Sequence, residues 1–165
     1  MQRPAPEQRP ASRRRALPSP SAGLIAAVVL AAIGYLLPWF KGARAEWWYS
    51  GWRYLTQSDG GWTTITLVLL AAALVAAVWA GEGDLPAVLA LTTLVAALVV
   101  AVLVVAASIA AIGSIEGSDS VAELDFGIGV PVMAVGFGLG VATGCHAIAS
   151  AVAADTEARI RARLG

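Results

Sequence analysis

Long apolar runs separated by short polar segments make up most of the chain. Four runs lack Asp, Glu, Lys and Arg, and they cover residues 22–40, 62–80, 85–112 and 126–154. Each is close to or longer than the roughly 20 helical residues that cross the hydrocarbon core of a bilayer. A lone apolar segment in lipid satisfies its backbone groups only as a helix. The pattern therefore predicts an all-α integral membrane protein, an antiparallel four-helix transmembrane bundle.

The polar segments define the rest of the predicted organisation. Residues 1–20 contain five prolines and five arginines and no apolar period, which predicts a disordered basic tail. The transmembrane domain then covers residues 21–154, with a Trp-rich outer loop at 41–61. The last segment, 155–165, holds two acid-then-base pairs spaced four residues apart, so it is expected to form a short charged cytoplasmic helix.

Composition and charge agree with a membrane protein and suggest its orientation. The chain is 58% hydrophobic and 13% charged, whereas soluble domains carry about 25% charged residues. Eight basic residues lie in the two tails, and three lie in the loop between the first two runs. Basic residues that flank spans mark the cytoplasmic side, so we expect a multi-pass protein of the cell membrane with both termini cytoplasmic.

The start of the chain also imitates a secretory signal. A basic segment and an apolar run precede the "ARA" of Ala43–Ala45, whose two alanines are spaced as in a cleavage site. The apolar run is near 19 residues, however, and signal peptides use about 7 to 15. An uncleaved first span is the preferred interpretation.

Few groups in the predicted spans can carry chemistry. His146 is the one titratable residue there besides Cys145 and Tyr35, and no second His exists in the chain. Adjacent Cys145 and His146 point about 100° apart on a helix, so they cannot share a metal. We expect no catalytic residue, no metal and no cofactor. His146 is either a pH-sensitive or ligand-contacting group or, preferably, a neutral imidazole bonded to a neighbouring helix.

The last run carries a spaced set of glycines. Gly136, Gly140 and Gly144 recur every four residues, which places them on one helical face. Small residues at this spacing let another helix approach closely, so the three are predicted helix-packing residues. A partner helix within the same chain is preferred over a second copy. Pro131 is expected to bend this helix near its outer end.

Five of the six tryptophans lie between residues 37 and 62. Trp39 and Trp62 are expected at the membrane surface, where indole rings place an apolar body in lipid and an N–H near water. Trp47, Trp48 and Trp52 lie in the loop and are candidate partner contacts. Packing and anchoring is the preferred role for this loop, ahead of partner contact and of a small-molecule cage.

Short motifs give the chain a resemblance to a known group. These are "LPW" at Leu37–Trp39, "SGW" at Ser50–Trp52, "GGW" at Gly60–Trp62 and "FGIG" at Phe126–Gly129. With them, the chain resembles small four-span membrane proteins of actinobacteria whose function is unknown. The resemblance implies no activity, cofactor or site residue. A tryptophan-biosynthesis-associated membrane protein is less similar, and claudin-like proteins have paired loop cysteines that this chain lacks.

The function expected from these features is a non-catalytic accessory, scaffold or envelope interaction protein. Its partners would be the lipid bilayer and another membrane protein or a second copy, with no nucleic acid. The alternative is a small-molecule transporter or pore acting as an oligomer. A thin set of polar residues in the spans argues against that alternative: Thr92, Thr93, Ser108, Thr143 and Ser150.

Overall fold

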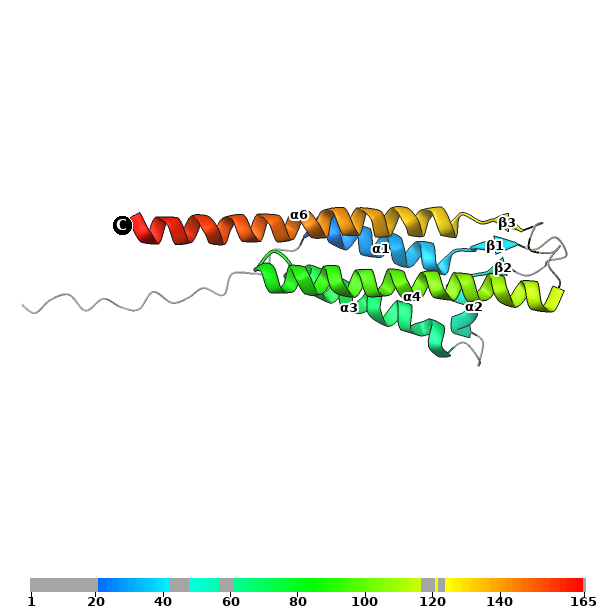
Figure 1. The fold of residues 1–165 in the computed structure, drawn as a ribbon. Helices are drawn as coiled ribbons and strands as arrows, with labels where there is room; N and C mark the ends of the chain where they lie inside the picture. Colours follow the sequence, from blue (N-terminus) through cyan, green and yellow to red (C-terminus); the bar gives the residue numbers. More distant parts are fainter. Residues whose placement is uncertain (1–20, 42–47, 57–60, 117–120, 122–123, 165) are drawn as a thin grey trace, which may run out of the picture.

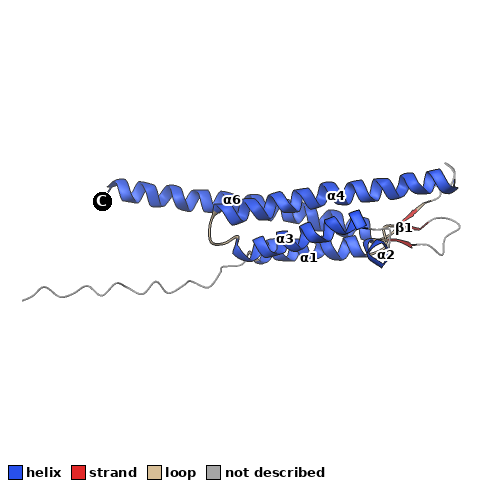
Figure 2. Cartoon of the chain, turned by 90° about the horizontal axis from the view of Figure 1, so that it is seen from below, coloured by secondary structure: helices blue, strands red, loops and turns tan. Residues whose placement is uncertain are grey.

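A computed structural model describes residues 21–41, 48–56, 61–116, 121 and 124–164. Four helices lie alongside one another and form the body of the molecule (Figures 1 and 2). They are α1 (Ala22–Leu36), α3 (Ile65–Trp79), α4 (Asp84–Glu116) and α6 (Gly129–Leu164). Helix α1 packs mainly against α6, and α3 packs mainly against α4.

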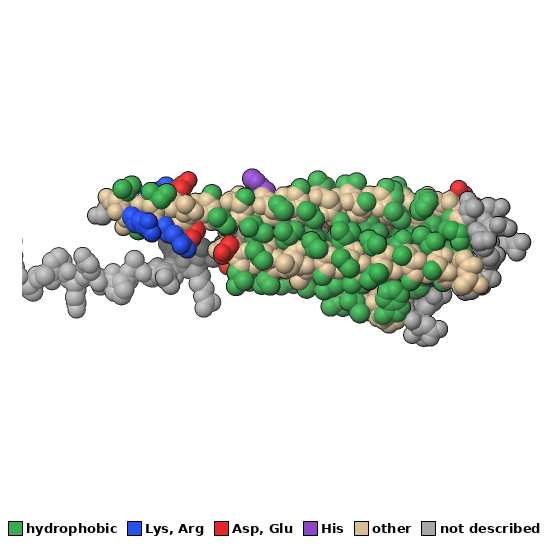
Figure 3. All heavy atoms as spheres, viewed as in Figure 1, with side chains coloured by type: hydrophobic (Ala, Val, Ile, Leu, Met, Phe, Trp, Pro, Cys, Tyr) green, Lys and Arg blue, Asp and Glu red, His purple; other side chains and the backbone are tan. Residues whose placement is uncertain are grey.

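Among the residues that the structure describes, three helical segments are long and apolar enough to cross a membrane. They are Gly61–Trp79, Asp84–Ser114 and Gly129–Leu164, whereas α1 is an apolar helix of 15 residues. Many large apolar side chains point outward along these helices, including Val68, which is 65% exposed (Figure 3). The chain is therefore a mostly helical protein whose apolar helices indicate a membrane-embedded fold. The first predicted span is helical over a shorter stretch than the sequence pattern predicts.

Helix α4 has a buried face that follows a heptad-like spacing. Its buried residues lie three or four positions apart: Ala87, Ala90, Leu94, Ala97, Ala101, Val104, Ser108 and Ile112. This spacing keeps one stripe of a helix in contact with its neighbours. Four of the eight are alanines, so the neighbouring helices can approach closely. The small residues in an otherwise uniform apolar run thus mark the inward side of α4.

One end of the molecule carries short elements that the apolar pattern did not predict. Strands β1 (Phe40–Lys41), β2 (Trp48–Tyr49) and β3 (Asp125–Phe126) form a sheet in the order β2-β1-β3. Both pairings are antiparallel, and Phe40 lies opposite Tyr49 on one side and Phe126 on the other. Helix α2 (Gly51–Thr56) and the 3-10 helix η1 (Gly61–Thr64) lie at this end too. We call it the cap end, and the opposite end, at the α3–α4 turn, the turn end.

The helix ends follow from local sequence. Helix α4 begins at Asp84, whose Oδ1 accepts a hydrogen bond from the Leu85 N–H at 2.9 Å. Helix α6 begins at Gly129, which places Pro131 in its first turn. A proline there interrupts no helical hydrogen bond. The bend predicted at Pro131 is therefore not required.

Helix α6 continues without interruption to Leu164 at the turn end. Its last turns carry ion pairs between Asp155 and Arg159, at 2.8 Å, and between Glu157 and Arg161, at 3.2 Å. These pairs form at the spacing that the sequence predicts. All four side chains are exposed, so each pair contributes little, about 0–1 kcal/mol.

Candidate functional site

The segment from Leu37 to Phe40, at the cap end of α1, is extended rather than helical. Leu37 has φ −71° and ψ 160°. The residue before a proline is restricted to such extended conformations, and Pro38 therefore ends α1 at Leu36. The "LPW" motif is thus the physical reason why α1 is short.

An extended segment next to lipid needs hydrogen-bond partners from elsewhere in the chain. The Trp39 N–H donates to the Tyr49 carbonyl oxygen at 2.7 Å. On the other side, the Gly127 N–H donates to the Trp39 carbonyl oxygen at 2.7 Å, and the Gly129 N–H donates to that of Pro38 at 2.9 Å. A residue that precedes α2 and residues that follow α4 therefore both form hydrogen bonds with the extended segment after α1.

These close approaches depend on glycine. A Cβ added at Gly129 would lie 2.7 Å from the carbonyl oxygens of Leu37 and Pro38 and 2.8 Å from that of Gly34. A Cβ added at Gly127 would lie 2.9 Å from the Pro38 carbonyl carbon. Both obstacles are backbone atoms, which cannot swing away as a side chain can. The glycines of the "FGIG" motif therefore let that segment pack directly against the backbone of the "LPW" motif.

The "SGW" motif contacts the same place from the loop. Gly51, the first residue of α2, is buried, and a Cβ there would lie 2.5 Å from the ring of Tyr35. The hydroxyl of Tyr54 on α2 lies 2.6 Å from the Ser108 hydroxyl. Ser108 donates its own proton to the Val104 carbonyl, so Tyr54 is the donor in this bond. Helix α2 is thus joined to both α1 and α4.

Aromatic rings fill the space inside this end. Trp39 and Phe40 are fully buried, and Tyr35 is 1% exposed. The Trp39 Nε1–H donates to the Tyr35 carbonyl oxygen at 2.9 Å, and the Tyr35 hydroxyl donates to the Thr63 carbonyl oxygen at 2.8 Å. The ring centroids of Tyr35 and Trp39 are 5.1 Å apart, and those of Trp39 and Tyr54 are 6.0 Å apart. We call these rings, β1–β3 and α2 the cap.

The cap separates the tryptophans into different environments. Trp39 lies inside the protein, with its ring fully buried. Trp52 and Trp62 are 60% and 48% exposed. Trp47 lies outside the described residues, and Trp48 belongs to β2, with its side chain likewise outside them.

The glycines of α6 lie in contacts within the chain. A Cβ at Gly136 would lie 2.7 Å from the Ala31 Cα on α1. Gly140 faces the Leu94 side chain on α4, and a Cβ at Gly144 would lie 3.0 Å from a methyl group of Leu91. The three helix-packing residues thus contact two different helices, with Gly136 against backbone.

The turn end is hollowed beside α6. A cavity of about 440 Å³ is lined by residues that include Ser21, Gly81, Thr143, His146 and Ser150. His146 is exposed, and Figure 3 shows it on the surface of α6. Cys145 is exposed as well. No hydrogen bond between the imidazole and a neighbouring helix occurs within the described residues, in contrast to the preferred expectation.

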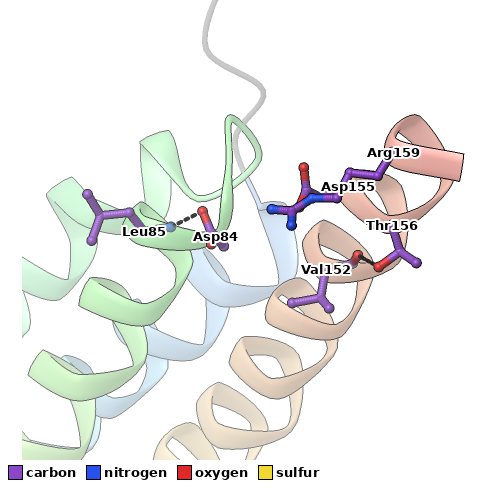
Figure 4. A network of polar contacts seen from close by, with 6 residues as sticks. All are labelled: Asp84, Leu85, Val152, Asp155, Thr156 and Arg159. Atoms are coloured by element: carbon purple, nitrogen blue, oxygen red, sulfur yellow. Dashed lines mark hydrogen bonds and ion pairs between the residues drawn. The ribbon is translucent and has the colours of Figure 1, made fainter. Parts of the chain in front are cut away.

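A second, more polar hollow lies next to it, with a volume of about 520 Å³. Glu82 and Asp84 come from the α3–α4 turn, and Asp155 and Arg159 come from α6. Figure 4 shows Asp84 across from the Asp155–Arg159 ion pair. These side chains are close to water, and the arrangement places no nucleophile beside a base.

The hydroxyl groups of the long helices bind their own backbone. Thr92, Thr93, Thr143 and Ser150 each donate to a carbonyl oxygen one turn earlier, at 2.7–2.9 Å. Hydroxyls bonded in this way do not require a water-filled path between helices.

The described residues contain no group of three or more His, Cys, Asp or Glu side chains that could hold a metal ion. Comparison with known proteins gives no match to a protein-family model, to a curated protein or to a solved structure. Among the features described above, the cap has the most specific geometry, and it is the candidate site. Sequence analysis found its motifs but not their contact with one another.

Proposed function

We propose that this chain is a four-span protein of the cell membrane with both termini in the cytoplasm. In this arrangement α1 crosses the membrane together with the extended segment Leu37–Phe40. The hydrogen bond to the Tyr49 carbonyl oxygen and those from the Gly127 and Gly129 N–H groups support this proposal, because non-helical backbone is tolerated at membrane depth where protein covers it. Antiparallel neighbours then follow from the short α3–α4 turn.

We further propose that the protein acts without catalysis, as an accessory or scaffold for another membrane protein. The observation that carries this proposal is the closed cap: the rings of Tyr35, Trp39 and Phe40 are buried against one another, and the backbone groups of Pro38 and Trp39 are bonded within the chain. A small-molecule cage would need an open face between those rings. The exposed surface consists instead of broad apolar helix faces, which fit lipid and transmembrane partners. The resemblance to small four-span proteins of actinobacteria agrees with this role.

Photo-crosslinking in native membranes tests the role. A photoreactive amino acid is placed at Val102 on α4 or Val135 on α6, which are 55% and 54% exposed. Ala97, which is fully buried on α4, serves as the matched control position. The proposal predicts that an exposed position captures one reproducible membrane protein and that the buried position captures none.

A flux assay on the purified protein in vesicles distinguishes this role from the alternative function, an oligomeric transporter or pore. An accessory protein leaves the permeability of the vesicles to small solutes unchanged. Specific solute flux without any captured partner would contradict the proposal and favour the oligomeric transporter or pore.

A further inference from the structure

One side of α3 and η1 carries a continuous stripe of exposed apolar residues. Its members are Trp62 at 48% exposure, Ile65 at 47%, Val68 at 65%, Val75 at 63% and Trp79 at 47%. They follow helical spacing, so they share one face. Trp62 and Trp79 stand 17 residues apart, or about 26 Å at about 1.5 Å per residue. The hydrocarbon core of a bilayer is about 30 Å thick.

Tryptophans at the two ends of a lipid-facing stripe mark the two membrane–water interfaces. Trp62 therefore gives the depth of the interface at the cap end. Helix α2 packs against η1, which contains Trp62. The short helix thus lies at the level of this interface.

The contacts of α2 fix the direction in which its outer side points. Gly51 lies against the Tyr35 ring, and Tyr54 is bonded to Ser108 on α4. An adjacent side of α2 presents Trp52 and Leu55, three residues apart and 60% and 45% exposed. The cap holds these two apolar side chains outward, on a helix that packs against η1, where the stripe ends at Trp62.

We propose that Trp52, Leu55 and Trp62 form a lipid-binding surface, the lipid patch, that lies in the headgroup–acyl boundary at the cap end. Its continuity with the stripe on α3 argues for lipid as the occupant rather than a protein partner. A short helix with Trp and Leu on one side and anchored polar groups on the other is suited to this boundary. This inference requires that α3 crosses the membrane, and it is independent of the accessory role.

Tryptophan fluorescence tests the lipid patch. The full-length protein is placed in phosphatidylcholine vesicles whose acyl chains carry bromine close to the headgroup, and acrylamide serves as the quencher in water. Replacing Trp52 by Phe should remove a component that bromolipid quenches and acrylamide does not. Trp62→Phe should remove a second such component.

Two other outcomes would overturn the proposal. Quenching of the Trp52 component by acrylamide alone would place this residue in water. Protection from both quenchers would mean that protein covers it, as in contact with a second copy. Circular dichroism checks that each variant is folded, which is expected because both side chains are largely exposed.

A nitroxide label gives an independent measurement that does not depend on the other tryptophans. Trp52→Cys is labelled in a Cys145→Ala background, and Gly83→Cys at the α3–α4 turn is the control, because a Cβ there meets nothing within 4 Å. The lipid patch predicts that the label at 52 collides with oxygen more often than with a polar nickel complex. A label at 52 that behaves like the one at 83 would contradict it.

Discussion

The backbone N–H of Gly127 donates a hydrogen bond to the carbonyl oxygen of Trp39 at 2.7 Å. These residues are 88 positions apart in sequence, one after the end of α1 and the other before the start of α6. Their contact brings the "LPW" and "FGIG" motifs together. It also gives the Trp39 carbonyl oxygen, which lies beyond the end of α1, a hydrogen-bond donor.

Replacing Gly129 by Ala should destabilise the protein by about 1–3 kcal/mol, the usual cost of overpacking. The new methyl group would meet three carbonyl oxygens within 2.8 Å, and none of them can move without shifting backbone. Unfolding in mixed detergent, followed by circular dichroism, measures the change. Gly138→Ala on the same helix is the control, because a Cβ there meets nothing within 4 Å. This control should be neutral or stabilising by up to about 1 kcal/mol.

Alanine substitutions along the glycine ridge of α6 should differ in cost. Gly136→Ala is expected to be the most damaging because the added Cβ meets the backbone of Ala31. Gly144→Ala is expected to be the mildest, since it meets a flexible Leu91 side chain at 3.0 Å. The free energies of unfolding of the two variants provide the comparison. Equal losses at both positions would contradict the packing described for this helix.

Trp39→Phe should destabilise the protein by about 1–3 kcal/mol, because the Tyr35 carbonyl oxygen loses a buried hydrogen bond. The smaller ring also leaves a cavity in the cap. Trp62→Phe, at an exposed position, should change the free energy of unfolding by less than about 0.5 kcal/mol. The same detergent unfolding assay compares them. A neutral Trp39→Phe would show that Trp39 is not a structural part of the cap.

Tyr54 and Ser108 should be energetically coupled, since their hydroxyl oxygens are 2.6 Å apart. Tyr54→Phe and Ser108→Ala should each cost about 0.5–1.5 kcal/mol. In a double-mutant cycle, the double variant should lose less than the sum of the single losses. Strictly additive losses would mean that this bond does not hold α2 against α4.

The long apolar helices could be predicted from the sequence because hydropathy and helix length follow directly from residue type. The spacing of Ala90, Ala97 and Ala101 also marks the inward face of α4. It could not be recognised in the sequence, because aliphatic residues occur on every face of this helix. The packing of Gly136, Gly140 and Gly144 within the chain followed the expected preference for a neighbouring helix.

The cap could not be predicted, because its strands are two residues long and β1 pairs with β3 across 86 positions of sequence at Phe40 and Phe126. No local pattern indicates that Phe40 lies opposite Phe126. The burial of Trp39 could not be predicted for the same reason. A tryptophan at the end of an apolar run has the same local sequence whether lipid or protein surrounds it.

Cysteine labelling of the membrane topology tests the central claim, that α1 and its extended end cross the membrane as the first of four spans. In a Cys145→Ala background, single cysteines replace Ser12, Thr56, Gly83 and Arg163, and intact cells receive a membrane-impermeant maleimide. The account predicts that the cysteine at 56 is labelled from outside and that those at 12, 83 and 163 are labelled only after permeabilisation. Labelling at 12 together with 56 in intact cells would leave α1 on one side of the membrane and contradict the four-span arrangement.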